Sequence, residues 1–97
     1  MFVIVCMRES YIQKVIVKKL KKAGYLVNTL GAPAGFPDVR AWGPDGRAIV
    51  IEVKRKGKKP TELQEIYLQK FRDRGYEAYF LDNSKEIDKI ILNKSYK

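Results

Sequence analysis

The chain has 97 residues and a formal net charge of +9, with 20 Lys plus Arg against 11 Asp plus Glu. Its length predicts one domain over residues 1–97, and its hydrophobic content of 45% suits a globular chain better than a disordered one. The absence of His excludes Ser-His-Asp and Cys-His catalysis, and a single cysteine excludes Cys-rich zinc sites. The charge favours a polyanionic partner, the alternative being a solvated basic surface.

The apolar start of the chain, residues 1–7, is too short for a membrane span and lacks the basic residues of a signal peptide. We expect it to form a short strand or a packed arm. Cys6 is interpreted as a small buried hydrophobe in a reducing compartment. These features predict an intracellular protein with no membrane association.

A helix is predicted over residues 8–23, because apolar residues recur at three- and four-residue steps and Gly24 is placed to end it. Residues 25–30 alternate well enough for a strand, and residues 31–37 form a loop rich in Gly and Pro. The buried stripe of the helix is expected to contain Ile12, Val15, Ile16, Leu20 and Ala23.

Two strands, 38–42 and 47–55, flank a turn at residues 43–46 and are followed by a basic loop. Thr61 and Gln64 have the form of a capping box at the start of a helix that ends at Gly75. A strand over 77–81 and a last helix capped by Ser84 give the order α-β-β-β-α-β-α. The second helix carries Leu63, Ile66, Tyr67 and Phe71 on one side, and the last helix carries Ile87, Ile90 and Ile91.

The turn between the two strands decides how they pair. Its Pro-Asp-Gly tip suits a three-residue loop with Gly46 in the left-handed region, which places Asp38 opposite Glu52. Opposed residues have Cβ atoms about 4.5–5.5 Å apart, so two carboxylates there repel unless a cation, a proton or water relieves them. Mg²⁺ binds a few carboxylates and leaves positions for water and phosphate, and Lys54 lies on the same face as Glu52. The opposite face is uniformly apolar, with Val39, Ala41, Ile49, Ile51 and Val53.

A structural interpretation of these acids stays open beside the metal site. Asp38 can cap the entry to a strand, and Glu52 with Lys54 can form an exposed polar stripe. A two-residue loop would also shift the register by one residue and separate the two acids. Asp45 follows a proline as well, but it lies at the far tip of the hairpin and is interpreted as turn chemistry.

Pro37-Asp38 followed by Glu52-Val53-Lys54 resembles the PD-(D/E)xK nuclease motif. The surrounding residues resemble the VRR-NUC branch of those nucleases over about residues 8–82. Members of the family often carry a basic residue at the position of Ala34. This difference concerns a phosphate contact and leaves the metal site unaffected. The segments that carry the resemblance include Arg8-Glu9-Ser10, Gly35-Phe36-Pro37-Asp38 and Pro60-Thr61-Glu62-Leu63-Gln64.

The resemblance implies an α/β, restriction-endonuclease-like core of order α-β-β-β-α-β with a C-terminal helix and a mixed sheet flanked by helices. It implies that Asp38 and Glu52 bind Mg²⁺, for which Mn²⁺ substitutes, and that the Val53 carbonyl completes the site. Lys54 would position the attacking water and stabilise developing charge.

Two further residues match the family pattern near the site. Glu9 matches a first-helix acid that reaches the metal through water, and its alternative is an acid that stabilises the start of a helix. Gln64 matches a glutamine at the start of the second helix, and this role is compatible with the capping box.

Basic residues cluster in two places. The loop after Glu52 is expected to bind phosphates without reading bases, with a solvated turn as the alternative, and its members are Arg55, Lys56, Lys58 and Lys59. A second candidate patch on the first helix contains Lys18, Lys19, Lys21 and Lys22. Trp42 and Phe36 could stack on a base, with core packing as the alternative that is favoured for Trp42.

The expected function is that of a Mg²⁺-dependent, structure-specific endonuclease that hydrolyses phosphodiester bonds in branched DNA, four-way (Holliday) junctions in particular. Small members of the family are similar to phage and viral nucleases, so a prokaryote or the host cell of a phage or virus is the expected setting. A homodimer would supply two sites for two symmetric cuts. The last helix is one candidate dimer surface, its alternative being core packing.

Two other functions stay open. One is a nuclease that cuts flaps or other DNA without a preference for junctions. The other is a non-catalytic, basic nucleic-acid-binding module that would show a steep salt dependence and no response to Mg²⁺.

Overall fold

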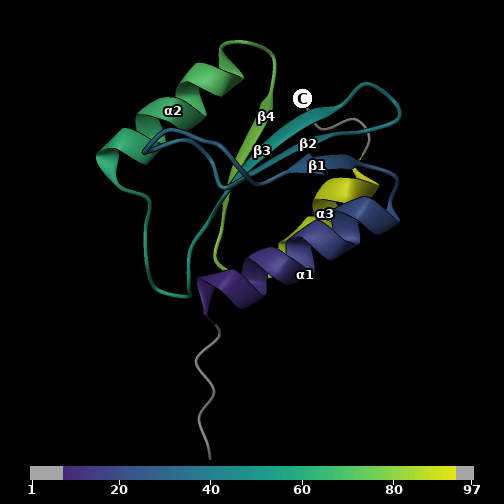
Figure 1. The fold of residues 1–97 in the computed structure, drawn as a ribbon, viewed down its shortest axis with the longest axis horizontal. Helices are drawn as coiled ribbons and strands as arrows, with labels where there is room; N and C mark the ends of the chain where they lie inside the picture. The colour runs from purple at the N-terminus through teal and green to yellow at the C-terminus, as the bar shows by residue number, and fades with distance from the viewer. Residues whose placement is uncertain (1–7, 94–97) are drawn as a thin grey trace, which may run out of the picture.

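The computed structural model describes residues 8–93, so the expectations for residues 1–7, including Cys6, lie outside the described residues. Helices and strands follow one another in the predicted order, within a few residues of the predicted bounds (Figure 1). None of the helices in this part of the chain is long and apolar enough to span a membrane. The elements are α1 (Glu9–Lys22), β1 (Leu26–Asn28), β2 (Val39–Trp42), β3 (Ala48–Val53), α2 (Glu62–Arg72), β4 (Glu77–Leu81) and α3 (Glu86–Leu92).

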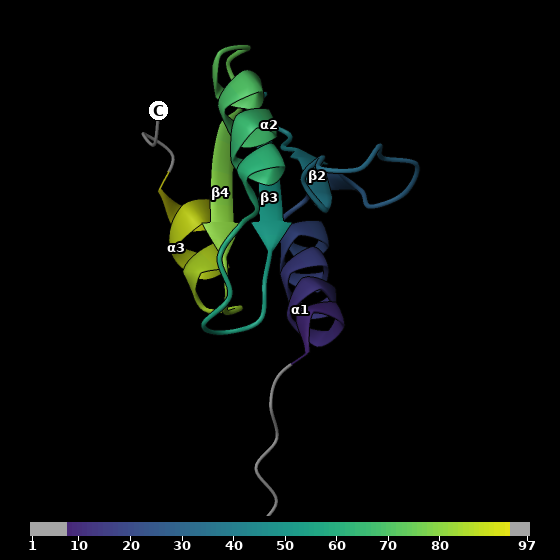
Figure 2. The same ribbon diagram turned by 90° about the vertical axis from the view of Figure 1, so that its left-hand side faces the viewer.

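The strands form a mixed sheet in the order β1-β2-β3-β4. The first three strands pair antiparallel, and β4 pairs parallel to β3 after the crossover through α2. Figures 1 and 2 show α2 on one face of the sheet and α1 with α3 on the other. The predicted α/β class with a mixed sheet flanked by helices is confirmed.

The turn between β2 and β3 has the predicted three-residue geometry. The Gly43 N–H donates to the Arg47 carbonyl at 2.7 Å, and the Gly46 N–H donates to the Gly43 carbonyl at 3.1 Å. Gly46 has a φ of +87°, a region that favours glycine. The resulting register pairs Val39 with Ile51, as predicted.

The main core lies between the sheet and the pair α1 and α3. The apolar sheet face is buried as predicted, and Ile87 and Ile90 of α3 are buried against it, which favours core packing over a dimer role for these two residues. The predicted stripe of α1 is only partly correct, because Val15 is half-buried and Ala23 is exposed. The residues of α1 and of the sheet that form this core include Ile12, Ile16, Leu20, Val39, Ala41, Ile49, Ile51 and Val53.

The face of α2 that packs on the sheet differs from the predicted one. Leu68 is the buried residue of α2 and packs against Val50 and Ala78. Leu63 and Ile66, two members of the predicted apolar side, are 46% and 45% exposed. Leu63 instead lies against Gly35 in the loop between β1 and β2.

The helix starts show one correct and one incorrect prediction. The capping box of α2 is present, with Thr61 Oγ1 accepting from the Gln64 N–H at 3.2 Å and Gln64 Oε1 accepting from the Thr61 N–H at 2.8 Å. Ser84 does not cap α3. Asn83 Oδ1 instead accepts from the backbone N–H groups of Lys85 and Glu86, because an Asn side chain can satisfy amides two and three residues ahead.

A buried ion pair ties the hairpin to β4, a contact absent from the sequence-based expectations. Arg47 Nε and Nη2 donate to the two carboxylate oxygens of Glu77 at 2.8 and 2.6 Å, and both side chains are less than 10% exposed. Burial opposes ionisation of Glu77, but the hydrogen bonds from Arg47 and from the Tyr79 hydroxyl keep its pKa below the usual range. Arg47 Nη1 also donates to the Ile91 carbonyl at 3.3 Å and so holds the end of α3.

The loop between β1 and β2 reaches across to α2 (Figure 1), and Gly35 allows that approach. A Cβ at Gly35 would lie 2.7 Å from Leu63 Cγ, and the φ of Gly35 is +87°. We expect Gly35→Ala to destabilise the fold by about 2 kcal/mol, through backbone strain and the clash with Leu63. Urea denaturation checks this value.

Gly75→Ala is the matched control for Gly35→Ala. Gly75 has a φ of +89°, but nothing lies within 4 Å of a Cβ placed there. The control therefore measures the backbone strain alone, and equal losses of stability in the two variants would contradict the close contact with Leu63.

Candidate active site

The two predicted acids meet at the end of β3. Asp38 immediately precedes β2, and the register that pairs Val39 with Ile51 places it opposite Glu52, close enough for its carboxyl group to raise the pKa of Glu52. Asp38 Oδ2 also accepts from the Val53 backbone N–H at 3.0 Å, which fixes the carboxylate beside β3. The predicted juxtaposition of the two acids is therefore present in the structure.

Glu52 is unusually placed for a glutamate. Its side chain is 2% exposed, and its buried Oε1 has no hydrogen-bond partner among the described residues. Burial raises the pKa of Glu52 to about 8, and the Asp38 carboxyl adds to this rise by hydrogen bonding and repulsion. The expectation that Glu52 forms part of an exposed polar stripe is wrong. The pair needs a proton or a cation at neutral pH.

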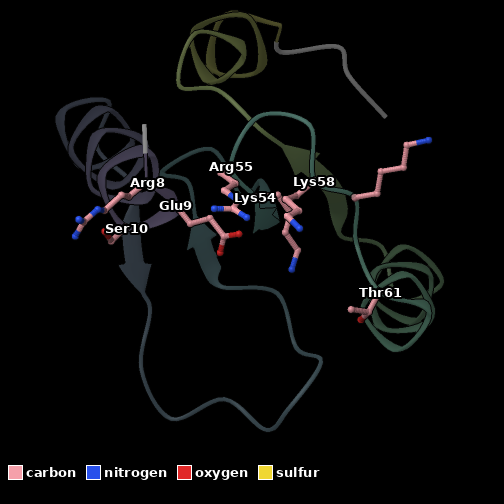
Figure 3. A pocket seen from close by; sticks show the side chains of 8 residues that line it. Arg8, Glu9, Ser10, Lys54, Arg55, Lys58 and Thr61 are labelled. Atoms are coloured by element: carbon pink, nitrogen blue, oxygen red, sulfur yellow. The ribbon is translucent and has the colours of Figure 1, made fainter. Parts of the chain in front are cut away.

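Lys54 and Glu9 carry opposite charges and have opposite effects on Glu52. Lys54 Nζ lies 3.9 Å from Glu52 Oε2, and its backbone N–H donates to the Leu81 carbonyl at 2.9 Å, which anchors it beside the end of β4. Lys54 lowers the pKa of Glu52 and Glu9 raises it, so both charges act on the buried carboxyl. In Figure 3 the Glu9 carboxylate points from the first turn of α1 toward Lys54 and Arg55.

An open pocket of about 660 Å³ lies next to Glu9 and Lys54. Three of the four basic residues predicted in the loop after β3 line it, whereas Lys56 is exposed on the loop and does not. Thr61 closes the far side at the start of α2, and Arg8 points away from the Lys54 side chain (Figure 3). The cations that line the pocket are Arg8, Lys54, Arg55, Lys58 and Lys59.

A second pocket, of about 390 Å³, lies beside Asp38. Asp38 and the predicted Gln64 both line it, and Gln64 keeps its side-chain N–H₂ outside the capping box. Gln13, which sequence reasoning missed, joins them from α1. Its position one helical turn after Glu9 is the signal that could have found it.

The other predicted contact residues lie farther from the acids. Lys18 and Lys22 are exposed on α1, about 14 and 20 Å along the helix axis from Glu9. Lys19 is paired with Asp88 of α3 at 2.8 Å and so has a structural role. Trp42 is 37% exposed, and its indole N–H donates to the Tyr76 hydroxyl at 3.4 Å, so it is not a core residue.

The donor set suits a hard divalent cation that keeps water ligands. No group of three acidic, His or Cys side chains in residues 8–93 could hold a metal by itself. Asp38 and Glu52 supply two carboxylates, which is the number that Mg²⁺ commonly takes together with waters and substrate phosphate. The unpartnered, buried Glu52 Oε1 is the observation that fits a cation at this point.

The raised pKa of Glu52 predicts an unusual pH dependence of stability without metal. The folded state holds a proton that the unfolded state releases near pH 4.5, so the free energy of unfolding should fall as the pH rises from about 4.5 to about 8. Glu52→Gln should flatten this slope, and Glu62→Gln, at an exposed position on α2, should keep it. Urea denaturation across this pH range, with EDTA present, is the measurement. A slope that persists in Glu52→Gln would place the buried proton elsewhere.

Comparisons with known proteins point to one family. The VRR-NUC domain model matches residues 16–84. A protein named "Putative nuclease p44", from Acyrthosiphon pisum secondary endosymbiont phage 1, is 30% identical over 86 residues, which cover 87% of this chain and 91% of that protein. A solved structure described as a VRR_NUC domain has a TM-score of 0.78 at 29% identity, over 89% of this chain and 96% of that one. Another, a VRR_NUC domain protein, shares the fold, with a TM-score of 0.71 at 17% identity over 90% and 87%.

Proposed function

Because the chain belongs to the VRR-NUC family of nucleases, we propose that it is a Mg²⁺-dependent endonuclease that cuts branched DNA at four-way junctions as a homodimer. VRR-NUC nucleases are typically metal-dependent. The observation that carries the proposal is the buried Glu52 paired with the half-buried Asp38, with Lys54 beside them and basic residues next to them.

Asp38 and Glu52 would hold Mg²⁺, or Mn²⁺ in its place, with the Val53 carbonyl as a third ligand and Glu9 acting through water. The metal would supply a water of lowered pKa and stabilise charge on the phosphate. The Val53 N–H keeps the Asp38 carboxylate oriented. Burial of Glu52 excludes bulk water from one side of the pair, which strengthens its attraction for a cation.

Lys54 would orient the attacking water and balance charge on the phosphate that is cut. Its side chain is 16% exposed, so its ammonium group is partly removed from water and keeps much of its electrostatic effect. Gln64 has a free side-chain N–H₂ at the second pocket and would donate to the substrate there. Glu9, Asp38, Glu52, Lys54 and Gln64 are thus the proposed catalytic residues.

DNA would be held by its phosphates. Arg55, Lys58 and Lys59 line the pocket beside Lys54, so they would contact the strand that is cut. Lys56 would contact the backbone from the loop. Lys18 and Lys22 would contact a second arm of a branched substrate, because they lie well away from the acids on α1. A two-fold dimer would place two sites against the two symmetric strands of a junction.

The testing experiment compares a four-way junction, a flap and a plain duplex, each end-labelled and incubated with Mg²⁺ or with EDTA. We expect paired, symmetric cuts in the junction with Mg²⁺ and none with EDTA. Sedimentation of the protein should give the mass of two chains. Equal cutting of flap and duplex would overturn the junction as the substrate, and binding without cutting under both Mg²⁺ and Mn²⁺ would overturn the nuclease itself.

A further inference from the structure

We propose that Phe36 and Tyr67 form a binding pocket for an unpaired nucleobase, one or two nucleotides from the phosphate that is cut. The inference rests on the proposed function for the position of that phosphate, and it adds a substrate feature that the acid pair and the basic loop do not supply. It starts from a third pocket, of about 360 Å³, lined by Phe36, Tyr67, Lys70, Phe71 and Arg74.

This third pocket shares one lining residue with the pocket at the active site. Phe36 lines it and also lines the pocket that contains Asp38 and Gln64. Phe36 precedes Asp38 by two residues, so their Cα atoms are at most about 7 Å apart. Successive nucleotides of one strand rise about 3.4 Å along B-DNA. A strand whose phosphate lies at Asp38 therefore places a neighbouring base within reach of Phe36.

The lining of the pocket suits the flat face of a base. The rings of Phe36 and Tyr67 have centroids 4.6 Å apart, and Phe36 and Phe71 meet edge to face at 5.5 Å. All three side chains are half-buried, so part of each stays open to solvent. Aromatic side chains of this kind stack on bases without regard to sequence. A base within a duplex is stacked on both sides, so the pocket fits an unpaired one.

The loop that carries Phe36 is held in place before any ligand binds. The loop before β2 is pressed against α2 at Gly35, and the Phe36 N–H donates to the Pro33 carbonyl at 3.1 Å. Arg40 Nη1 donates to the Pro37 carbonyl at 2.9 Å and fixes the other side of the loop. Ordering of the aromatic rings therefore costs little on binding, which favours affinity.

Charge identifies the occupant as a nucleotide. Lys70 Nζ lies 5.3 Å from the centre of the Tyr67 ring. Arg74 Nη1 donates a hydrogen bond of 2.8 Å to the Lys70 carbonyl, which holds Arg74 beside Lys70. The described residues that line the pocket include these two cations and no acid. A phosphate attached to a stacked base would meet this positive charge, so the pocket suits a nucleotide.

The test measures binding of a forked DNA with a short single-stranded arm by fluorescence anisotropy in EDTA. A single abasic site is moved along the arm one nucleotide at a time. We expect one or two adjacent positions at which the missing base weakens binding by about tenfold. With Mg²⁺, the sensitive positions should lie within about two nucleotides of the cut.

Tyr67→Leu should remove this dependence on the base, so that intact and abasic arms bind alike. Tyr11→Leu is the matched control, because Tyr11 is an exposed tyrosine of α1 on the opposite face of the sheet, and it should retain the tenfold effect. Circular dichroism verifies that both variants are folded. The abasic-site scan with the wild-type protein tests base binding even if a variant fails to fold.

An abasic scan without a sensitive position would overturn the base pocket, as would a Tyr67→Leu variant that keeps the sensitivity. A Tyr67→Leu variant that changes only the sedimenting mass would show an interface between copies and overturn it too. A protein with a sensitive position that cuts no DNA would contradict the nuclease function and leave the pocket standing.

Discussion

Asp38→Asn is expected to reduce cleavage of branched DNA by about a thousandfold or more, which corresponds to the several kcal/mol that a catalytic metal contributes. The substitution keeps the size of the side chain but removes one of the two carboxylates that would hold the metal. Binding of the same DNA in EDTA should stay within a few-fold of wild type, because phosphate contacts through lysines and arginines provide the affinity. Single-turnover cleavage and anisotropy measure the two effects separately.

Asp45→Asn is the matched control for this loss. Asp45 also follows a proline, but it is exposed at the tip of the hairpin, where its Oδ1 accepts from the Arg47 N–H at 3.3 Å. An asparagine keeps that acceptor, so cleavage should match wild type. Glu52→Gln and Lys54→Ala should lose cleavage as Asp38→Asn does. Cleavage that persists in all three variants would contradict the proposed mechanism.

Glu77→Ala is expected to destabilise the fold by about 3–5 kcal/mol, because it leaves the buried Arg47 guanidinium without its carboxylate. For a chain of this size such a loss lowers the melting temperature by more than about 10 °C. The double variant Arg47→Met with Glu77→Leu should recover most of the loss, since an apolar pair of similar volume avoids burying a lone charge. Urea denaturation of all three proteins is the measurement.

Glu86→Ala provides the control for an exposed ion pair. Glu86 Oε1 lies 3.9 Å from Lys89 Nζ, and both side chains are largely open to solvent. Its loss should cost less than about 1 kcal/mol. Equal losses in Glu77→Ala and Glu86→Ala would contradict the anchoring role of the pair that Arg47 forms.

The acid pair was predictable from the sequence because its determinants are local. The turn at residues 43–46 sets the loop length, and the loop length sets the register along the whole of β2 and β3. Alternating apolar residues on the other face independently require the same register, since a slip of one residue would expose them. Asp38 and Glu52 therefore meet for reasons that a single hairpin contains.

Features that depend on how distant elements pack were not predictable in this way. The face of α2 that is buried depends on where the crossover places the helix on the sheet, and Leu63 and Ile66 fall outside that contact. Arg47 and Glu77 are 30 residues apart and pair only once β4 has joined β3. The pocket that Phe36 shares with Tyr67 also needs a loop and a helix to meet, so neither segment indicates it alone.

The most direct test of the metal site is Mn²⁺ binding, measured by electron paramagnetic resonance with a non-cleavable branched DNA bound. Substrate phosphate is present in this experiment because it is expected to complete the coordination of the metal. We predict that wild type and Asp45→Asn bind Mn²⁺ alike and that Asp38→Asn and Glu52→Gln bind it much more weakly. Equal binding by all four proteins would contradict a metal site at Asp38 and Glu52.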